Sequence, residues 1–163
     1  MRHIAYIALG ANLQQPQQQL DLALQRLDAH ADLTLLACSP YYRSAPIGPQ
    51  DQDDFINAVC RVATDLTPVQ LLAQLQHIEH EQGRQRLRHW GPRSLDLDLL
   101  FYDDLVQQDA QLTLPHPRIA ERAFVLYPLH DLLGDTALPD GRSWTGLWAG
   151  IAGQRIERLH TSD

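Results

Sequence analysis

The sequence predicts an α+β domain in which helices cover a mostly antiparallel central sheet as α/β/α layers, close to the ferredoxin-like arrangement. Three observations lead to this prediction. Four apolar runs, at 3–9, 33–43, 55–64 and 94–102, have the length and composition of strands. Two segments between these runs repeat apolar residues at helical spacing. The resulting order, β-α-β-β-α-β, is the order that builds such a layered fold.

The first half of the chain supplies one strand, one helix and two further strands. The first strand ends at Gly10, and Asn12 can cap the helix that follows. This helix presents one apolar face, formed by Leu20, Ala23, Leu24 and Leu27. Pro40 interrupts the second strand, and a long loop rich in Pro, Gly and Asp leads from it into the strand over 55–64.

The second half begins with a helix that Thr67 caps, with Pro68 at its first position. The helix ends at Gly83, and its inward face consists of Leu71, Leu72, Leu75 and Ile78. A second long loop covers 84–92; two such loops in one small domain indicate active-site lids. The strand after it alternates, with one face formed by Leu95, Leu97, Leu99 and Phe101. A helix over 122–133 and a short one at Trp144, Leu147 and Trp148 close the core.

Composition limits the class of protein. The 163 residues fit one domain over 1–163, with 44% hydrophobic and 20% charged residues. The net charge of −7 argues against a protein that coats nucleic acid. All 13 basic residues are Arg, which excludes a Walker A loop and a Schiff-base lysine.

The same composition predicts a cytoplasmic protein. No run approaches the ~18 apolar residues that a membrane span requires. The apolar start is too short for a signal peptide, so we interpret it as the first strand. Cys38 and Cys60 lie in apolar contexts, which predicts buried free thiols in a reducing compartment.

Asp96 and Asp98 are the first candidates for chemistry. They share one face of a strand, about 7 Å apart at the backbone, because side chains alternate with period two. Two unpaired carboxylates this close would repel each other, and a divalent cation such as Mg²⁺ removes the conflict. The alternative is an exposed strand face that carries acids for solubility.

The segment before this pair contains arginines and no acid. Its cations are Arg84, Arg86, Arg88 and Arg93. A guanidinium group can bind two phosphate oxygens at once through two parallel hydrogen bonds. An Arg-rich loop beside two acids that can hold a metal ion therefore indicates a polyphosphate site. A merely solvated loop is the alternative for the arginines alone.

Three further residues are candidates with open interpretations. Glu79 lies near a helix C-terminus, where the helix dipole disfavours a carboxylate; a polar task at the site or a salt bridge to an Arg would each explain it. His116 lies between two prolines, in a catalytic or a structural role. Arg122 is a further cation.

The motif HWGPRSLDLDLL (89–100) resembles the signature of the 6-hydroxymethyl-7,8-dihydropterin pyrophosphokinase family of folate biosynthesis. Four other segments follow the family's order and spacing: YIALGANL (6–13), YYRSAPIGPQDQDDFINAV (41–59), IEHEQGR (78–84) and LPHPRIAERAFVLYPL (114–129). The resemblance covers most of residues 4–140. It implies a monomeric α+β enzyme that binds ATP with two Mg²⁺ ions. Such an enzyme moves the β,γ-pyrophosphoryl unit of ATP to the pterin's hydroxymethyl group and releases AMP.

The resemblance also implies roles for individual residues. Asp96 and Asp98 would hold both metal ions, and Arg84 and Arg93 would contact the transferred phosphates as further catalytic residues. The ATP-binding positions would be Gln76, Glu79, Arg86, Trp90, Leu99, Leu112, Thr113, His116 and Arg122. The pterin-binding positions would be Ser44, Pro46, Ile47, Phe55, Asn57 and Phe124.

These roles are physically reasonable. Phe55 and Phe124 can stack on a flat pterin, although core packing would also explain them. Asn57 carries the donors and the acceptor that can read a pterin's amide edge. No general base is evident, so catalysis would depend on positioning and charge stabilisation.

Two other functions remain as alternatives. A catalytically silent pterin- or nucleotide-binding module could use the same scaffold and would bind ATP without releasing AMP. A two-metal nucleotidyltransferase or nuclease could use the same acid pair, but the net charge of −7 argues against a nucleic-acid partner.

Overall fold

A computed structural model describes residues 2–12, 15–45, 53–83 and 95–159. Its frame is a six-stranded sheet in the order β5-β1-β4-β3-β8, with β2 also paired to β4. Every described pairing in it is antiparallel. The strands are β1 (His3–Ala11), β2 (Leu33–Cys38), β3 (Tyr42–Ser44), β4 (Phe55–Thr64), β5 (Asp96–Tyr102) and β8 (Ile156–Arg158).

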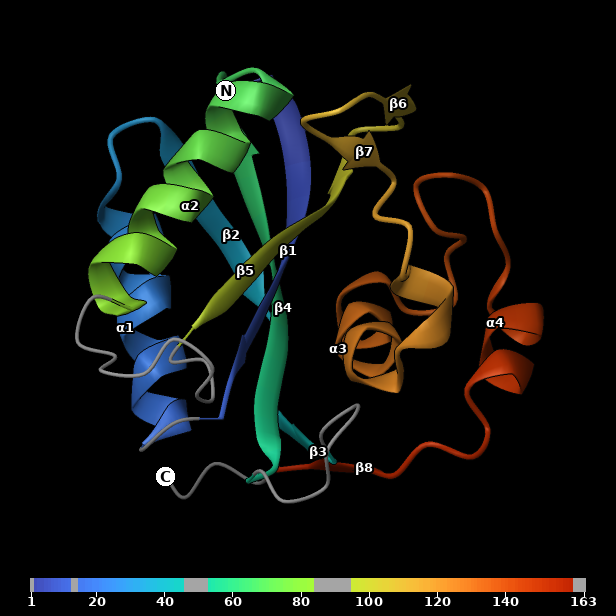
Figure 1. Cartoon of the computed structure of the whole chain (residues 1–163). Coiled ribbons are helices and arrows are strands. Elements are labelled where there is room, and N and C mark those ends of the chain that lie inside the picture. The colour runs from blue at the N-terminus through green and yellow to red at the C-terminus, as the bar shows by residue number, and fades with distance from the viewer. Residues whose placement is uncertain (1, 13–14, 46–52, 84–94, 160–163) are drawn as a thin grey trace.

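Helices cover both faces of this sheet (Figure 1). One face carries α1 (Pro16–Ala29) and α2 (Pro68–Gly83), and the other carries α3 (Ala123–Leu133) and α4 (Trp144–Gly150). A hairpin of β6 (Gln107–Gln108) and β7 (Thr113–Leu114) follows β5, and a 3₁₀ turn, η1 (Ile119–Glu121), precedes α3. The predicted layered α+β fold is therefore confirmed.

Each face of the sheet has its own apolar core. The core under α1 and α2 includes Leu9, Leu20, Leu71 and Leu75, all almost fully buried. The core under α3 and α4 includes Val59, Leu126 and Leu129. Each large apolar side chain buried in this way contributes about 2 kcal/mol to folding. The sheet is thereby held rigidly between two helical layers.

Helix α2 begins as the sequence predicts. The backbone N–H of Gln70 donates to Thr67 Oγ1 over 3.2 Å, and the N–H of Thr67 donates to Gln70 Oε1 over 2.9 Å. This reciprocal capping satisfies two backbone donors at the helix start. Pro68 occupies the first helical position.

Two predictions about the first strand and helix are wrong. Strand β1 continues through Gly10 to Ala11, since Gly10 pairs with both Asn57 and Asp96. Asn12 does not cap α1. The N-cap is Gln15, in a left-handed conformation (φ 57°), and the Asn12 side chain donates instead to the Asp53 carbonyl over 3.3 Å.

The predicted alternation of β5 also fails at its far end. In the pairing with β1, Ile7 lies opposite Leu99 and Tyr6 opposite Phe101, so Leu100 is an extra residue in a β-bulge. Phe101 therefore packs in the core under α3, on the other face from Leu97 and Leu99. The bulge lies beyond Asp96 and Asp98, whose shared face is preserved.

The cysteines are free, as predicted. Cys38 and Cys60 lie opposite each other in the β2–β4 pairing, without a disulfide. Burial raises the pKa of Cys38 to about 11 and raises the pKa of Cys60 as well. Among the described helices, none combines the length and the apolar character that crossing a bilayer requires.

Candidate active site

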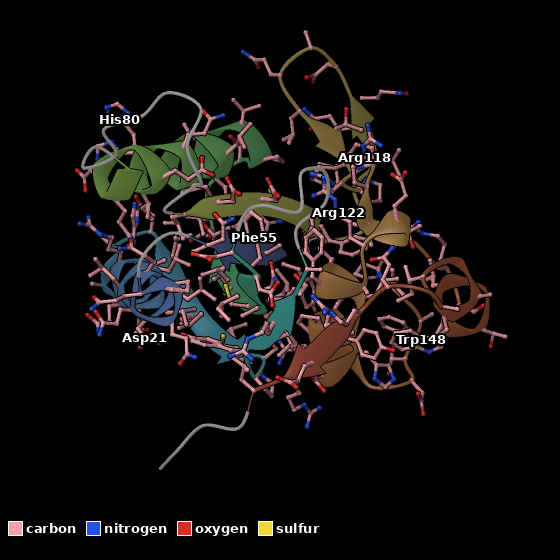
Figure 2. All side chains as sticks on the ribbon, turned by 60° about the horizontal axis from the view of Figure 1, so that its bottom comes forward. Asp21, Phe55, His80, Arg118, Arg122 and Trp148 are labelled. Carbon is pink, nitrogen blue, oxygen red and sulfur yellow. The ribbon has the colours of Figure 1, made fainter. Side chains whose placement is uncertain are left out.

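A cavity of about 300 Å³ opens where β1, β4 and β5 meet the start of α3. Four of its lining residues have small side chains or none, so they leave the cavity unfilled: Ala8, Gly10, Ser44 and Ala45. The sequence-predicted residues that it brings together are Ser44, Phe55, Asn57, Asp96, Asp98, Arg122 and Phe124. In Figure 2, Phe55 and Arg122 lie near the middle of the molecule, and Arg118 lies farther out.

Asp96 and Asp98 line one wall of this cavity. In the pairing with β1 they lie opposite Gly10 and Ala8, whereas Leu97 between them is buried in the core under α2. Both acids are half-buried, and the side chain of Asp98 is 41% exposed. Solvent and a ligand can therefore reach both carboxylates.

Arg122 brings a cation to the same cavity. Its Nη1 lies 3.9 Å from Asp98 Oδ2, and its guanidinium carbon lies 5.5 Å from the centre of the Phe124 ring. Both partners of the ion pair are partly exposed, so the pair adds little to stability. Its effect is to keep a positive charge next to the acids.

Asn57 is held in a fixed orientation. Its side chain is buried, and Nδ2 donates to Ser44 Oγ over 2.8 Å. A Cβ added at Gly10 would lie 3.1 Å from Asn57 Oδ1, so this amide lies directly against the glycine. Gly10 and Asn57 both line the cavity, so this amide can offer a hydrogen-bond acceptor to a ligand there.

Glu79 has a role that neither interpretation of its sequence position included. Its Oε2 accepts a hydrogen bond of 2.8 Å from the backbone N–H of Leu97, the residue between the two acids. Helix α2 therefore contacts the acid-bearing strand directly. No sequence pattern indicates this contact, because the two residues belong to different elements.

His116 lies beside the cavity as a neutral imidazole. Burial lowers its pKa, and Arg122 and Arg118 lower it further, whereas Asp98 acts in the opposite direction. Its Nδ1 accepts a hydrogen bond of 3.1 Å from the backbone N–H of Arg118. The neutral ring then carries its proton on Nε2, where it can donate to an anionic oxygen.

Comparison with known proteins agrees with this geometry. The family model described as 7,8-dihydro-6-hydroxymethylpterin-pyrophosphokinase (HPPK) matches residues 6–134. The chain belongs to the HPPK family. Residues that this family's motifs implied now lie around one cavity.

Two relatives are similar along almost their whole length, and both are named 2-amino-4-hydroxy-6-hydroxymethyldihydropteridine pyrophosphokinase. The protein of Haemophilus influenzae is 44% identical over 96% of this chain and 98% of its own. That of Pseudomonas aeruginosa is 47% identical over 94% and 95%. A crystal structure of Plasmodium falciparum HPPK-DHPS shares the fold, with a TM-score of 0.71 and 14% identity over 90% of this chain and 45% of that one.

Some residues that the HPPK resemblance implied do not reach the cavity. Leu99 and Leu112 are buried in the core under α2, Thr113 is half-buried on β7, and Gln76 is exposed on α2. Their ATP-side roles stay predictions. Six further positions lie outside the described residues: Pro46, Ile47, Arg84, Arg86, Trp90 and Arg93.

The cavity also uses residues that the sequence analysis did not assign to it. Gly10 was interpreted only as the end of a strand, yet it forms part of the wall beside Asn57. Its position inside the family motif YIALGANL was the available signal. Ala8 and Leu9 lie in the same motif and Ala45 lies in the motif over 41–59, but the resemblance implied no role for these three residues.

Proposed function

We infer that this chain transfers the pyrophosphoryl group of ATP to the hydroxymethyl group of 6-hydroxymethyl-7,8-dihydropterin. The products are AMP and the pterin diphosphate, in a step of folate biosynthesis. Membership of the HPPK family and the near full-length similarity to two named pyrophosphokinases support this function. The observation that carries it is one cavity that holds two acids, a cation, two aromatic rings and a fixed amide.

We propose that the apolar part of the cavity binds the pterin. Phe55 and Phe124 are half-buried and line the cavity. Part of each ring is therefore accessible and can stack on a flat heteroaromatic ligand. Asn57 Oδ1 and the Ser44–Asn57 pair supply polar contacts for the pterin's edge. A cavity of about 300 Å³ suits a ligand of this size.

We propose that Asp96 and Asp98 hold two Mg²⁺ ions together with the phosphates of ATP. No group of three or more metal-binding side chains occurs among the described residues. Mg²⁺ commonly takes only one or two carboxylates and completes its shell with water and phosphate, so this exposed pair fits. Bound Mg²⁺ would supply charge neutralisation for the phosphate oxygens.

The remaining residues orient the reactants. The pterin's hydroxyl oxygen attacks the β-phosphorus, the bond from that phosphorus to the bridging α,β-oxygen breaks, and AMP leaves with this oxygen, while the hydroxyl proton is released to water. Arg122 faces the negative charge of the phosphates, and the Nε2–H of His116 donates to an anionic oxygen. Stacking on Phe55 and Phe124 keeps the hydroxymethyl group in line for attack.

We further propose one catalytic domain that acts as a monomer in the cytoplasm. The HPPK family model matches one continuous range, residues 6–134, which supports a single catalytic domain. The free thiols agree with a reducing compartment.

Detection of AMP tests the function. The chain is incubated with ATP and Mg²⁺, with and without 6-hydroxymethyl-7,8-dihydropterin, and AMP is quantified. We expect AMP only when the pterin is present. Binding of ATP and pterin without AMP release would favour the catalytically silent module instead.

A further inference from the structure

Gln154 makes a bidentate contact with the backbone on both sides of Arg122. Its Oε1 accepts a hydrogen bond of 2.9 Å from the N–H of Ala123, and its Nε2 donates one of 2.6 Å to the carbonyl of Glu121. A backbone N–H can only donate and a carbonyl can only accept, so the amide has a single orientation. Gln154 lies outside residues 6–134, which the HPPK model matches.

Gln154 contacts the backbone where two helical elements meet. Arg122 connects η1 to α3 in an extended conformation (φ −126°, ψ 105°). It is the N-cap residue of α3, but its side chain makes no capping hydrogen bond. The N–H of Ala123 is one of the first donors of α3, which have no partner within the helix. The Gln154 side chain supplies an acceptor for this N–H and also binds the carbonyl of Glu121.

Gln154 is itself anchored on both sides. Its N–H donates to the Ile151 carbonyl over 3.0 Å, at the end of α4. Strand β8 begins shortly after it and pairs with β3, where Ile156 lies opposite Ser44. Arg158, in the same strand, binds Asp131 of α3 through Nη2 and Oδ1 over 2.5 Å. The C-terminal segment thus connects two walls of the cavity.

We propose that Gln154 is a positioning residue for Arg122 in the pyrophosphoryl-transfer reaction. By fixing the backbone on either side of Arg122, it sets the direction from which the guanidinium group enters the cavity, next to Asp98 and over Phe124. This inference rests on the proposed contact of Arg122 with the phosphates. Gln154 is exposed, so water can replace its hydrogen bonds and a variant keeps most of the stability of the fold.

The test compares Gln154→Met, which keeps the length of the side chain and removes both hydrogen bonds, with Gln25→Met on the exposed side of α1. We expect kcat/KM for ATP to fall about tenfold in Gln154→Met, because small displacements of a charged group weaken transition-state contacts. The pterin Kd and the melting temperature should stay close to wild type, and Gln25→Met should match wild type in all three. Gln154→Glu keeps the acceptor for Ala123 but turns a carboxylate oxygen toward the Glu121 carbonyl, so a loss at least as large as in Gln154→Met is expected.

A double-mutant cycle with Arg122→Ala decides whether Gln154 acts through Arg122. We expect Gln154→Met to cause no further loss in the Arg122→Ala background. An equal loss in both backgrounds would overturn the inference while leaving Arg122 in its role. Unchanged kcat/KM in Arg122→Ala alone would overturn the role of Arg122 and the inference together. Absence of AMP formation by the wild-type chain would instead contradict the proposed function.

Discussion

The carboxylate of Glu79 on α2 accepts a hydrogen bond of 2.8 Å from the backbone N–H of Leu97 on β5. Strand β5 is at the edge of the sheet as far as the structure describes it, and no described strand pairs with its outer side. Leu97 lies between Asp96 and Asp98. The acid-bearing segment is therefore bound to β1 by strand pairing and to α2 by the hydrogen bond with Glu79. The spacing of the two acids is thereby fixed from both sides.

Replacement of Glu79 should cost both stability and activity. Glu79→Leu leaves the Leu97 N–H without its acceptor, and an unsatisfied buried donor costs about 1–3 kcal/mol. Glu79→Gln keeps an acceptor oxygen and should cost less. Urea denaturation measures the free energy of unfolding, and an AMP assay measures kcat. Equal stability of the Leu and Gln variants would show that this hydrogen bond does not hold the strand.

Gly10→Ala should weaken pterin binding selectively. The added Cβ would lie 3.1 Å from Asn57 Oδ1, so the amide must shift away from Gly10 and from its bond to Ser44. We expect the Kd for the pterin to rise several-fold with the Kd for ATP nearly unchanged, as measured by calorimetry. The matched control is Gly146→Ala on α4, where a Cβ meets nothing within 4 Å. A pterin Kd equal to wild type in Gly10→Ala would contradict the assignment of Asn57.

Arg122→Ala should raise the pKa of His116. Burial of His116 is the largest cause of its lowered pKa. The positive charge of Arg122 lowers the pKa further, and the substitution removes this charge. An NMR titration of the His116 ring follows the change, with Arg26→Ala, whose side chain pairs with Glu81, as the control. An unchanged or lower pKa in Arg122→Ala would contradict the arrangement of these two residues.

The same lowered pKa predicts a direction for stability. The unfolded chain protonates His116 near the ordinary value of 6.5, and the folded chain does so only at lower pH. The unfolded state therefore binds more protons between the two values, and stability decreases as pH falls through this window. Urea denaturation between pH 7 and pH 5, at about half-unit steps, should show a weaker decrease in His116→Gln than in wild type. An equal decrease in both proteins would show that His116 does not contribute.

Features that depend on neighbouring residues could be predicted from the sequence. The capping of α2 involves Thr67 and Gln70, which are separated by two residues. The common face of Asp96 and Asp98 follows from the period of a strand. The residues of one family motif also implied which side chains would meet around the cavity.

Features that depend on pairing between distant segments could not be predicted. The bulge at Leu100 arises from the pairing of β5 with β1, and it moves Phe101 to the opposite core. Asparagine is a common helix cap, but the Asn12 amide donates its hydrogen bond to the Asp53 carbonyl, which is distant in sequence. Gln154 is an exposed glutamine with no pattern around it, and only the fold brings it to Arg122.

Asp96 and Asp98 carry the proposed metal chemistry, and AMP release by Asp96→Asn and Asp98→Asn tests their role. The assay contains ATP, Mg²⁺ and 6-hydroxymethyl-7,8-dihydropterin, with circular dichroism to verify folding and Asp104→Asn, an exposed acid in the turn after β5, as the control. We predict that each acid variant folds and loses about two orders of magnitude or more in kcat, because neither can hold a metal-bound triphosphate for attack. Wild-type turnover by either folded variant would show that the acid pair does not hold the metal-bound triphosphate.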